Sequence, residues 1–198
     1  MKTITTIAAI TAIAGAAHGQ AFYEDFEGGL PAGWTVTDDA GEGIVWDTNV
    51  AWGDDNWATG DGMSMAVNSD TIPGEFDTSL ITNTFTVPNG ASLDLTANYQ
   101  NFAGSDFFDI DINDGSGWNN LLSWNEDHGT FMGAPGEDVS LDISAYGGSD
   151  VQVRFRYYDP NTGDWDWYIQ IDNVTVTPAP GAMALLGLGG LVATRRRR

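Results

Sequence analysis

The sequence predicts an all-β domain, an antiparallel jelly-roll β-sandwich. Apolar and polar residues alternate with a period of two in several segments of the middle of the chain, as in strands that bury one face and expose the other. Glycine, asparagine, aspartate and proline interrupt these segments about every ten residues, which is typical of β-sandwiches and barrels. No strong helical repeat interrupts this pattern between residues 21 and 177.

Four segments show the alternation, most clearly the strand expected over 150–159. The inward rows are expected to be Leu93, Leu95, Ala97 and Tyr99; Phe108, Ile110 and Ile112; Val139, Leu141 and Ile143; and Val151, Val153, Phe155 and Tyr157. Asp109 and Asp111 are expected to be outward carboxylates. The glycine-containing turn 113–117 should connect their strand to another over 118–124 as a hairpin.

The last strand, expected over 165–177, changes its pattern halfway. Apolar residues occupy odd positions up to Ile171 and even positions from Val174 onward. A strand cannot change faces without an extra residue, so we expect a β-bulge at Asp172 and Asn173. The bulge would turn an aspartate or asparagine side chain toward the edge of the sheet.

Charge is distributed unevenly along the chain. Residues 21–177 hold all 28 acidic residues and only two basic ones, Arg154 and Arg156, for a formal charge of −26. Such a charge repels nucleic-acid phosphates and anionic membranes, so neither is an expected partner. It attracts hard cations, which favours structural Ca²⁺. It also suits salty water, where screening weakens self-repulsion.

Catalytic chemistry has little support in the sequence. Residues 21–177 contain no cysteine, no lysine and a single histidine, His128. The sequence shows no Ser-His-Asp order, zinc-protease motif or phosphate-binding loop. Paired carboxylates could hydrolyse glycosides, but among 28 acidic residues no pair is distinguished. We therefore expect a protein that is not an enzyme.

The first 20 residues are expected to be a signal peptide. Lys2 supplies the positive charge, residues 4–17 form an apolar and small-residue run, and small residues precede the end of the segment. Cleavage after Gly19 and cleavage after Ala21 are both compatible with this pattern. The alternative, an N-terminal core helix, is disfavoured because no polar face interrupts the run.

Several motifs occur in a specific order along residues 21–177, which we expect to form one domain. They are EDFEGGLPAGW at 24–34, DTSLI at 77–81, TFTV at 84–87, LDISAY at 141–146, VQVRF at 151–155 and IDNVTV at 171–176. In order and spacing they resemble the MAM-like jelly-roll domains of bacterial surface proteins, the choice-of-anchor J and cleaved-adhesin group. The resemblance implies an exported, non-catalytic adhesion or binding protein of the cell surface or extracellular matrix.

The same resemblance implies a structural Ca²⁺ ion shared by the first and last strands. The matching residues are Asp25 or Glu27 at the opening and Asp172 at the close. The bulge expected at 172–173, derived from the residue pattern alone, directs a polar side chain to the same edge. The alternative is that these carboxylates cap strand ends in solvent.

Residues 178–198 resemble a PEP-CTERM sorting signal. They comprise Pro178, Ala179 and Pro180, an apolar segment 182–194 expected to be a short helix, and the cluster Arg195, Arg196, Arg197 and Arg198. The family pattern has glutamate in place of Ala179. The resemblance implies an exosortase-type processing enzyme as a partner. A helix of this length reaches about 20 Å, short of a ~30 Å hydrocarbon core, which favours transient inner-membrane contact of the precursor through 182–194.

Tryptophans near carboxylates suggest an alternative function, a surface-displayed carbohydrate-binding module. Trp52 and Trp57 lie close to Asp54 and Asp55, and Trp165 begins the last strand. An exposed ring can stack on a sugar while polar groups bind its hydroxyls, and surface polysaccharide would then be the partner. The tryptophans expected in the core instead are Trp34, Trp46 and Trp167.

Overall fold

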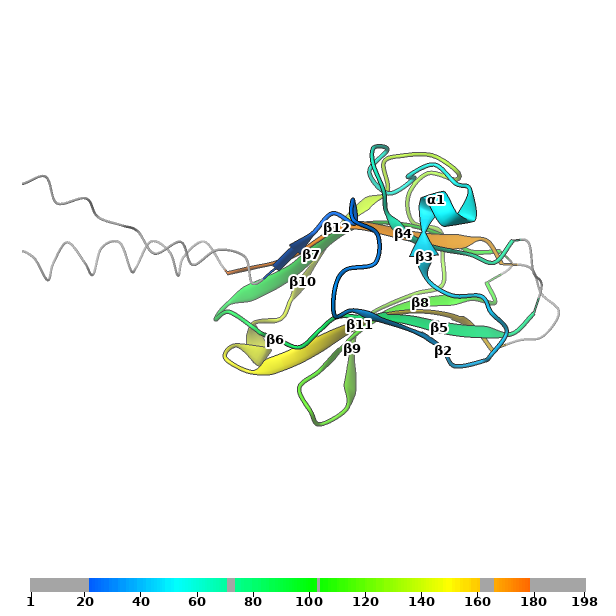
Figure 1. Cartoon of the computed structure of the whole chain (residues 1–198). Coiled ribbons are helices and arrows are strands. Elements are labelled where there is room, and N and C mark those ends of the chain that lie inside the picture. Colours follow the sequence, from blue (N-terminus) through cyan, green and yellow to red (C-terminus); the bar gives the residue numbers. More distant parts are fainter. Residues whose placement is uncertain (1–21, 71–73, 103, 161–165, 179–198) are drawn as a thin grey trace, which may run out of the picture.

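The computed structural model describes residues 22–70, 74–102, 104–160 and 166–178, which form a two-layered β-sandwich (Figure 1). In chain order the elements are β1 (Phe22–Glu24), β2 (Thr35–Asp38), β3 (Asp47–Thr48), α1 (Asn49–Trp52), β4 (Met65–Asn68), β5 (Phe76–Ile81), β6 (Phe85–Thr86), β7 (Ala91–Gln100), β8 (Phe107–Asn113), β9 (Trp118–Trp124), β10 (Glu137–Asp142), a 3-10 helix (Ser144–Tyr146), β11 (Asp150–Asp159) and β12 (Tyr168–Pro178). The expected signal peptide, Trp165, and the sorting tail from residue 179 onward lie outside the described residues.

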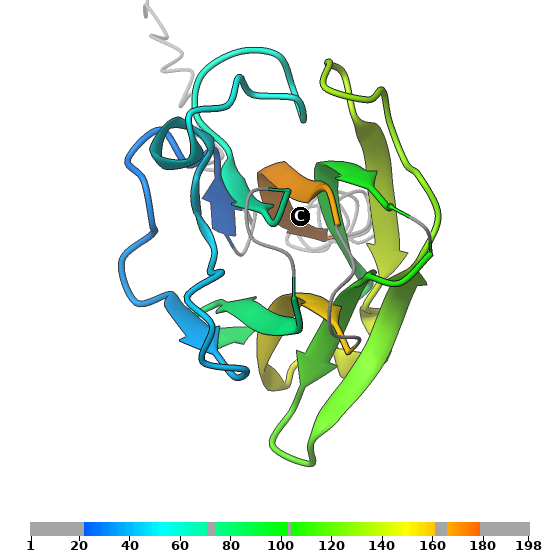
Figure 2. The same cartoon turned by 90° about the vertical axis from the view of Figure 1, so that its right-hand side faces the viewer.

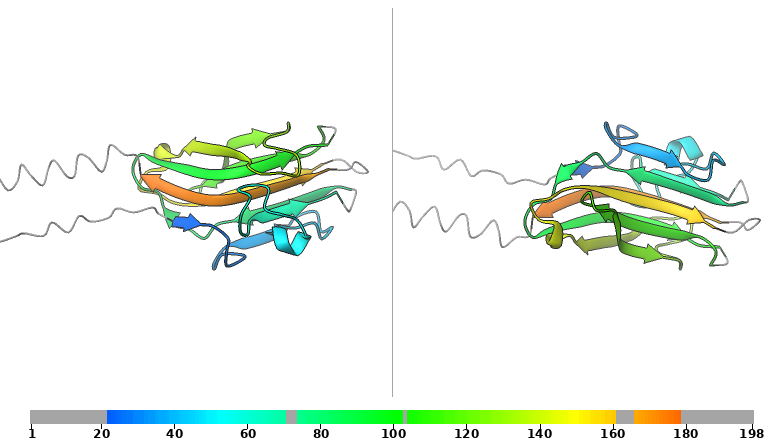
Figure 3. Two further views of the ribbon diagram at one scale, coloured as in Figure 1. Left: turned by 90° about the horizontal axis from the view of Figure 1, so that it is seen from above. Right: turned by 90° about the horizontal axis from the view of Figure 1, so that it is seen from below.

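The strands form two sheets, and every strand pair among the described residues is antiparallel. The first sheet has the order β10-β7-β12-β4-β3, and β1 also pairs with β12. The second has the order β2-β5-β11-β8-β9, and β6 also pairs with β11. Seen from above and below, β12 lies beside β7 in one layer, and β11 lies between β8 and β5 in the other (Figure 3). The predicted fold class is confirmed.

The core lies between the two sheets and contains the predicted inward rows. Of the predicted rows, only Leu141 is left partly exposed, on the edge strand β10. Trp34, which precedes β2, stacks on Phe155 of β11 within the core, with ring centroids 6.2 Å apart. Trp46 is also buried, as predicted. Removal of apolar surface from water, at roughly 25 cal/mol per Å², therefore holds the two layers together.

The predicted bulge is present in β12. Its pairing with β7 shifts register between Asp172 and Thr175, and Asn173 has a φ of 53°. Asparagine is one of the few residues that adopt this left-handed conformation readily. The bulge leaves the Asp172 side chain only 3% exposed and lets the Asn173 Oδ1 atom accept a hydrogen bond from the Tyr23 hydroxyl at 2.6 Å.

Asp109 and Asp111 point outward from β8, but they are not exposed as predicted. Asp111 is 4% exposed because the Nε and Nη2 atoms of Arg154 both donate to its Oδ2 atom, at 3.0 and 2.8 Å. The Arg154 guanidinium also covers the ring of Trp118, 4.6 Å from its centroid. Cross-strand pairing, which the alternation pattern does not reveal, thus buries a polar face.

Among the described residues, no helix is both long enough and apolar enough to cross a membrane. The apolar segment 182–194 falls outside those residues, so its expected membrane contact stays a prediction.

Candidate functional site

The three predicted metal ligands line one pocket. Asp25 and Glu27 follow β1, and Asp172 lies at the bulge of β12. Because β1 pairs with β12, the first and last strands of the domain lie side by side. The pocket has a volume of about 460 Å³, and Asp61 adds a fourth carboxylate to its lining. We call Asp25, Glu27, Asp61 and Asp172 the acidic pocket.

Neutral hydrogen-bond donors hold the Asp172 carboxylate in place. Its Oδ2 atom accepts from Asn56 Nδ2 at 2.9 Å and from Thr59 Oγ1 at 2.6 Å. Its Oδ1 atom accepts from the backbone N–H of Asn173 at 2.7 Å. None of these donors carries a positive charge, so the negative charge of Asp172 is oriented but not neutralised.

Glu27 is held over Gly62. Its Oε1 atom accepts from the backbone N–H of Met63 at 2.9 Å. A Cβ atom at Gly62 would lie 1.7 Å from that oxygen, so only glycine leaves room for the carboxylate. Asp25 Oδ1 accepts from the backbone N–H of Glu27 at 3.3 Å, which fixes the turn after β1.

The acidic pocket has a negative potential. Burial raises the pKa of Asp172, and the charge of Glu27 raises it further. Burial and then the charges of Asp25 and Asp172 raise the pKa of the Tyr23 hydroxyl. These hard oxygen ligands suit Ca²⁺. No three metal-ligating side chains among the described residues already surround one point, so calcium binding stays a prediction.

A second pocket, which we call the polar pocket, lies beside the acidic pocket and shares Asp61 with it. Its volume is about 580 Å³. Three residues predicted to bind a ligand, Asp54, Asp55 and Trp57, line it, whereas Trp52 does not. Burial raises the pKa of Asp54, opposed by a hydrogen bond from Asn68. The structure thus brings most of the predicted ligand site together.

The predicted exposure of Trp57 is wrong, and Trp52 is exposed only in part, whereas Trp165 lies outside the described residues. Trp57 is 8% exposed, and its ring lies 4.4 Å from that of Tyr168. Trp52 is partly buried, and its Nε1 atom donates to the carbonyl of Ala66 at 3.1 Å. Conversely, Trp167 is only partly buried because β12 begins one residue later. The loop between α1 and β4, which carries Trp57, packs on the outer face of the first sheet, where the Trp57 backbone donates to Gln170 and accepts from Asn98.

The exposed aromatic surface is formed by other residues. Phe102 and Phe131 are each 45% exposed, and both contact Trp167. The Phe131 and Trp167 rings meet edge to face, with centroids 3.9 Å apart. We call Phe102, Phe131 and Trp167 the aromatic patch. Met132, next to Phe131, is 48% exposed and lines the polar pocket, which connects the two features.

Sequence reasoning did not identify the aromatic patch. Its members come from three separate segments, after β7, between β9 and β10, and before β12. A local signal was available, because Phe102 and Phe131 are isolated aromatic residues in loops with small and polar neighbours. Large apolar residues in such loops have no strand periodicity to place them in the core.

Asn98 ties the loops of the polar pocket to the outer face of β7. Its Nδ2 atom donates to the carbonyl groups of Trp57, Thr130 and Gly133, at 3.0, 2.9 and 2.8 Å. One buried amide thus fixes both loops that line the pocket. The pocket is therefore held in shape by the sheet.

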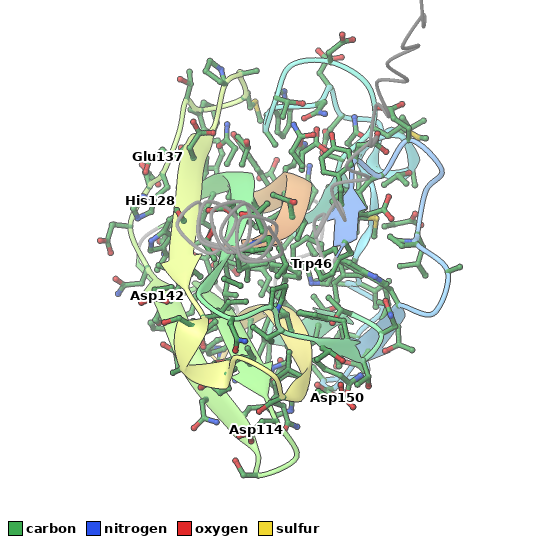
Figure 4. The ribbon with its side chains drawn as sticks, turned by 90° about the vertical axis from the view of Figure 1, so that its left-hand side faces the viewer. Trp46, Asp114, His128, Glu137, Asp142 and Asp150 are labelled. Carbon is green, nitrogen blue, oxygen red and sulfur yellow. The ribbon has the colours of Figure 1, made fainter. Side chains whose placement is uncertain are left out.

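His128 forms a pair with Glu137 on β10 (Figure 4). Its Nδ1 atom lies 3.0 Å from a Glu137 carboxylate oxygen, and its ring stacks on Trp124 with centroids 3.7 Å apart. The hydrogen bond with His128 lowers the pKa of Glu137. The hydrogen bond and the stacking define a structural role for this histidine.

Comparison with known proteins identifies the fold. No model of a known protein family matches the chain, and no curated protein has significant sequence similarity to it. A cleaved adhesin domain of Lys-gingipain from Porphyromonas gingivalis superimposes with a TM-score of 0.58 at 21% identity, covering 79% of this chain and 97% of that chain. The module TmCBM61, in complex with beta-1,4-galactotriose, gives 0.55 at 12% identity, covering 78% and 94%.

A third structure, Caldicellulosiruptor saccharolyticus CBM27-1 in complex with mannohexaose, gives a TM-score of 0.51 at 15% identity, covering 78% of this chain and 94% of that chain. The described domain therefore has the jelly-roll β-sandwich fold seen in cleaved adhesin domains and carbohydrate-binding modules. The sequence resemblance to the cleaved-adhesin group is confirmed at the level of the fold.

Proposed function

We propose that this chain is an exported, non-catalytic adhesion or binding protein that binds carbohydrate through the aromatic patch and the polar pocket. The aromatic patch carries the proposal, because exposed rings bordering a pocket of carboxylates and amides match the chemistry of a sugar. Ring faces stack on the apolar side of a sugar, and polar groups bind its hydroxyls. The ligand-binding role predicted for Asp54 and Asp55 is retained.

The charge of the site favours a neutral polysaccharide. Asp54, Asp55 and Asp61 line the polar pocket, and an acidic sugar would be repelled by them. Two solved structures of the same fold contain neutral oligosaccharides, a galactotriose and a mannohexaose. These likenesses support the class of ligand.

Delivery to the surface forms the second part of the proposal. Residues 1–20 direct export, and the tail 178–198 addresses the precursor to an exosortase-type enzyme through transient inner-membrane contact. The acidic domain is the displayed product. The order of an apolar N-terminal segment, one β-sandwich and a basic C-terminus supports this arrangement.

Removal of one exposed ring is expected to weaken carbohydrate binding without unfolding the domain. Phe131→Ala should lower affinity for neutral oligosaccharides about two- to twelvefold, since an aromatic contact contributes roughly 0.5–1.5 kcal/mol. Glycan-array binding followed by titration calorimetry measures the effect. Leu30→Ala is the matched control, because Leu30 is 48% exposed and lies in the loop between β1 and β2.

Two results would contradict the proposal: absence of binding to any neutral glycan by the intact chain, or equal affinity of Phe131→Ala and Leu30→Ala. Thermal unfolding of both variants shows whether a loss of binding reflects a loss of structure.

We also propose that the acidic pocket binds a structural Ca²⁺ ion through Asp25, Glu27 and Asp172. EDTA is then expected to lower the melting temperature by several degrees, because an ion that binds only the folded state stabilises it by mass action. Glu27→Gln should remove most of this ion's contribution. Glu42→Gln, at an exposed loop position, is the control.

Calorimetric melting curves with EDTA and with excess Ca²⁺ measure these effects. An identical EDTA response in Glu27→Gln and Glu42→Gln would exclude calcium from the acidic pocket.

A further inference from the structure

Three carboxylates are buried together at one end of the sandwich, away from both pockets. Asp106 precedes β8, Asp159 ends β11 and Asp166 precedes β12. Their exposed fractions are 0%, 0% and 1%. β11 ends, and β8 and β12 begin, at the end of the sandwich that faces the viewer in Figure 2. We call these residues the buried acid cluster.

Each member of the cluster has a defined neighbour. The carboxyl groups of Asp159 and Asp166 share a hydrogen bond. Asp166 Oδ1 also accepts from Ser105 Oγ at 3.2 Å, and Asp106 Oδ2 accepts from the Tyr157 hydroxyl at 2.7 Å. The other oxygen of Asp106, Oδ1, is buried and has no hydrogen-bond partner among the described residues. A buried carboxylate oxygen without a partner is costly.

Within the part of the chain that the structure describes, no positive side chain compensates these charges. Of the basic residues between 21 and 177, Arg154 pairs with Asp111 and Arg156 with Asp77, both on the outer face of the second sheet. The hydroxyl groups of Tyr157 and Tyr99 face Asp106, but they are neutral donors. Buried carboxylates are normally paired or bound to a metal ion.

Burial and mutual repulsion raise the pKa values of two members of the cluster. Burial, followed by the charges of Asp106 and Asp159, raises the pKa of Asp166 to about 8. Burial raises the pKa of Asp106 to about 6, and the charge of Asp159 acts in the same direction. These directions agree with the burial of three carboxylates side by side, and the case for a bound ion rests on that burial and on the unpartnered Oδ1 atom of Asp106.

We propose that the buried acid cluster is a second cation site, which takes a hard divalent ion of the Ca²⁺ class. Asp159 and Asp166 are the direct carboxylate ligands, because they already touch. Asp106 contributes the third negative charge and its unpartnered Oδ1. Since no three metal-ligating side chains of the described ranges already surround one point, neutral oxygens such as Ser105 Oγ and water complete the coordination.

Calcium is favoured over softer metals by the ligand types. The cluster has only oxygen ligands, whereas zinc and copper sites use cysteine or histidine. Calcium also accepts irregular sets of six to eight oxygens, and magnesium needs a near-ideal octahedron. The ion would join the end of β11 to the segments that precede β8 and β12. The Ser105 hydroxyl proton is shared between Asp166 and the carbonyl of Phe102, and Asp166 precedes Trp167, so the site adjoins two residues of the aromatic patch.

The test is Asp166→Asn in the full chain, with Glu27→Gln as the reference for the acidic pocket. We expect Asp166→Asn to bind one Ca²⁺ fewer than the wild type by titration calorimetry at about pH 8. Its melting temperature should rise less on addition of Ca²⁺, and in EDTA it should exceed that of the wild type. The amide keeps the shape of the side chain but removes a buried charge.

An unchanged Ca²⁺ stoichiometry together with a wild-type response to Ca²⁺ would overturn the proposal, whatever Glu27→Gln shows. If Asp166→Asn fails to fold, Asp106→Asn takes its place. We expect this variant to bind Ca²⁺ more weakly than the wild type. An unchanged affinity would overturn the proposal. Tb³⁺ alone as a probe gives an independent readout, because Tyr157 can sensitise its luminescence. Because Tyr23 lines the acidic pocket and can sensitise an ion there as well, the comparison is made in the Glu27→Gln background. Adding Asp166→Asn should lower the signal that remains, and an unchanged signal contradicts the proposal.

Discussion

In EDTA, the free energy of unfolding is expected to fall as the pH rises from about 5 to about 8. The unfolded chain ionises Asp166 near its ordinary pKa, whereas the folded chain retains the proton until about 8. Between these values the folded state binds more protons, so stability decreases with rising pH. Asp106, with a pKa raised to about 6, acts in the same direction. The total effect is on the order of several kcal/mol.

The direction of this pH dependence distinguishes the domain from proteins in which folding stabilises the ionised form of carboxylates. The pKa of Glu137 is lowered, so its contribution is lost toward low pH instead, but this group is exposed and its effect is small. Repulsion among surface carboxylates also grows with pH. A salt concentration of about 1 M strongly screens the repulsion among surface carboxylates, but it screens the repulsion among the buried carboxylates much less.

Urea unfolding at a series of pH values, in EDTA and high salt, measures the dependence. Asp166→Asn is the control and should have a flatter profile, because its amide does not titrate. A free energy of unfolding that stays constant or rises between about pH 5 and 8 would contradict the burial and mutual repulsion of the cluster.

Gly136→Ala is expected to lower the melting temperature by about 3–10 °C and to abolish carbohydrate binding. A Cβ atom at Gly136 would lie 2.3 Å from the backbone oxygen of Ala97 in β7. The backbone N–H of Gly136 also donates to the carbonyl of Ala58 at 2.7 Å. The added methyl group must push the loop before β10 off the sheet, and overpacking of this kind costs about 1–3 kcal/mol or more.

The loss of binding follows from the same displacement. The loop that Gly136 ends carries Phe131 and Met132, so both the aromatic patch and the polar pocket would be disturbed. Gly28→Ala is the matched control. A Cβ atom there would meet nothing within 4 Å, and Gly28 is outside the left-handed region. Equal melting temperatures and equal glycan affinities for the two variants would show that this loop is not held as described.

Local periodicity was enough to predict the longer strands of the second half of the domain. The strand predicted over 150–159 has the same first and last residues as β11. The shift of apolar residues from odd to even positions around Asp172 identified the bulge in β12. Both features depend on which face of a strand is buried, which the order of apolar residues records directly. The convergence of Asp25, Glu27 and Asp172 in one pocket was implied by the resemblance to the cleaved-adhesin group.

Exposure of single side chains could not be predicted in this way. Trp57 is buried because a loop folds over the first sheet, and Asp111 is buried because Arg154 crosses from the neighbouring strand. The aromatic patch and the buried acid cluster each combine three segments that are distant in sequence. Strand pairing and loop packing create these contacts, and the period-two pattern of the sequence does not record them.

The sequence by itself determined the all-β class, the positions of the main strands, the bulge and the very acidic character of the domain. These properties depend on residue types and on the period-two pattern, which act locally. Only the tertiary structure decided which rings reach solvent and which carboxylates lie together without a counter-charge. Those properties depend on which segments meet across the two sheets, because burial and electrostatic energy are set by neighbours in space.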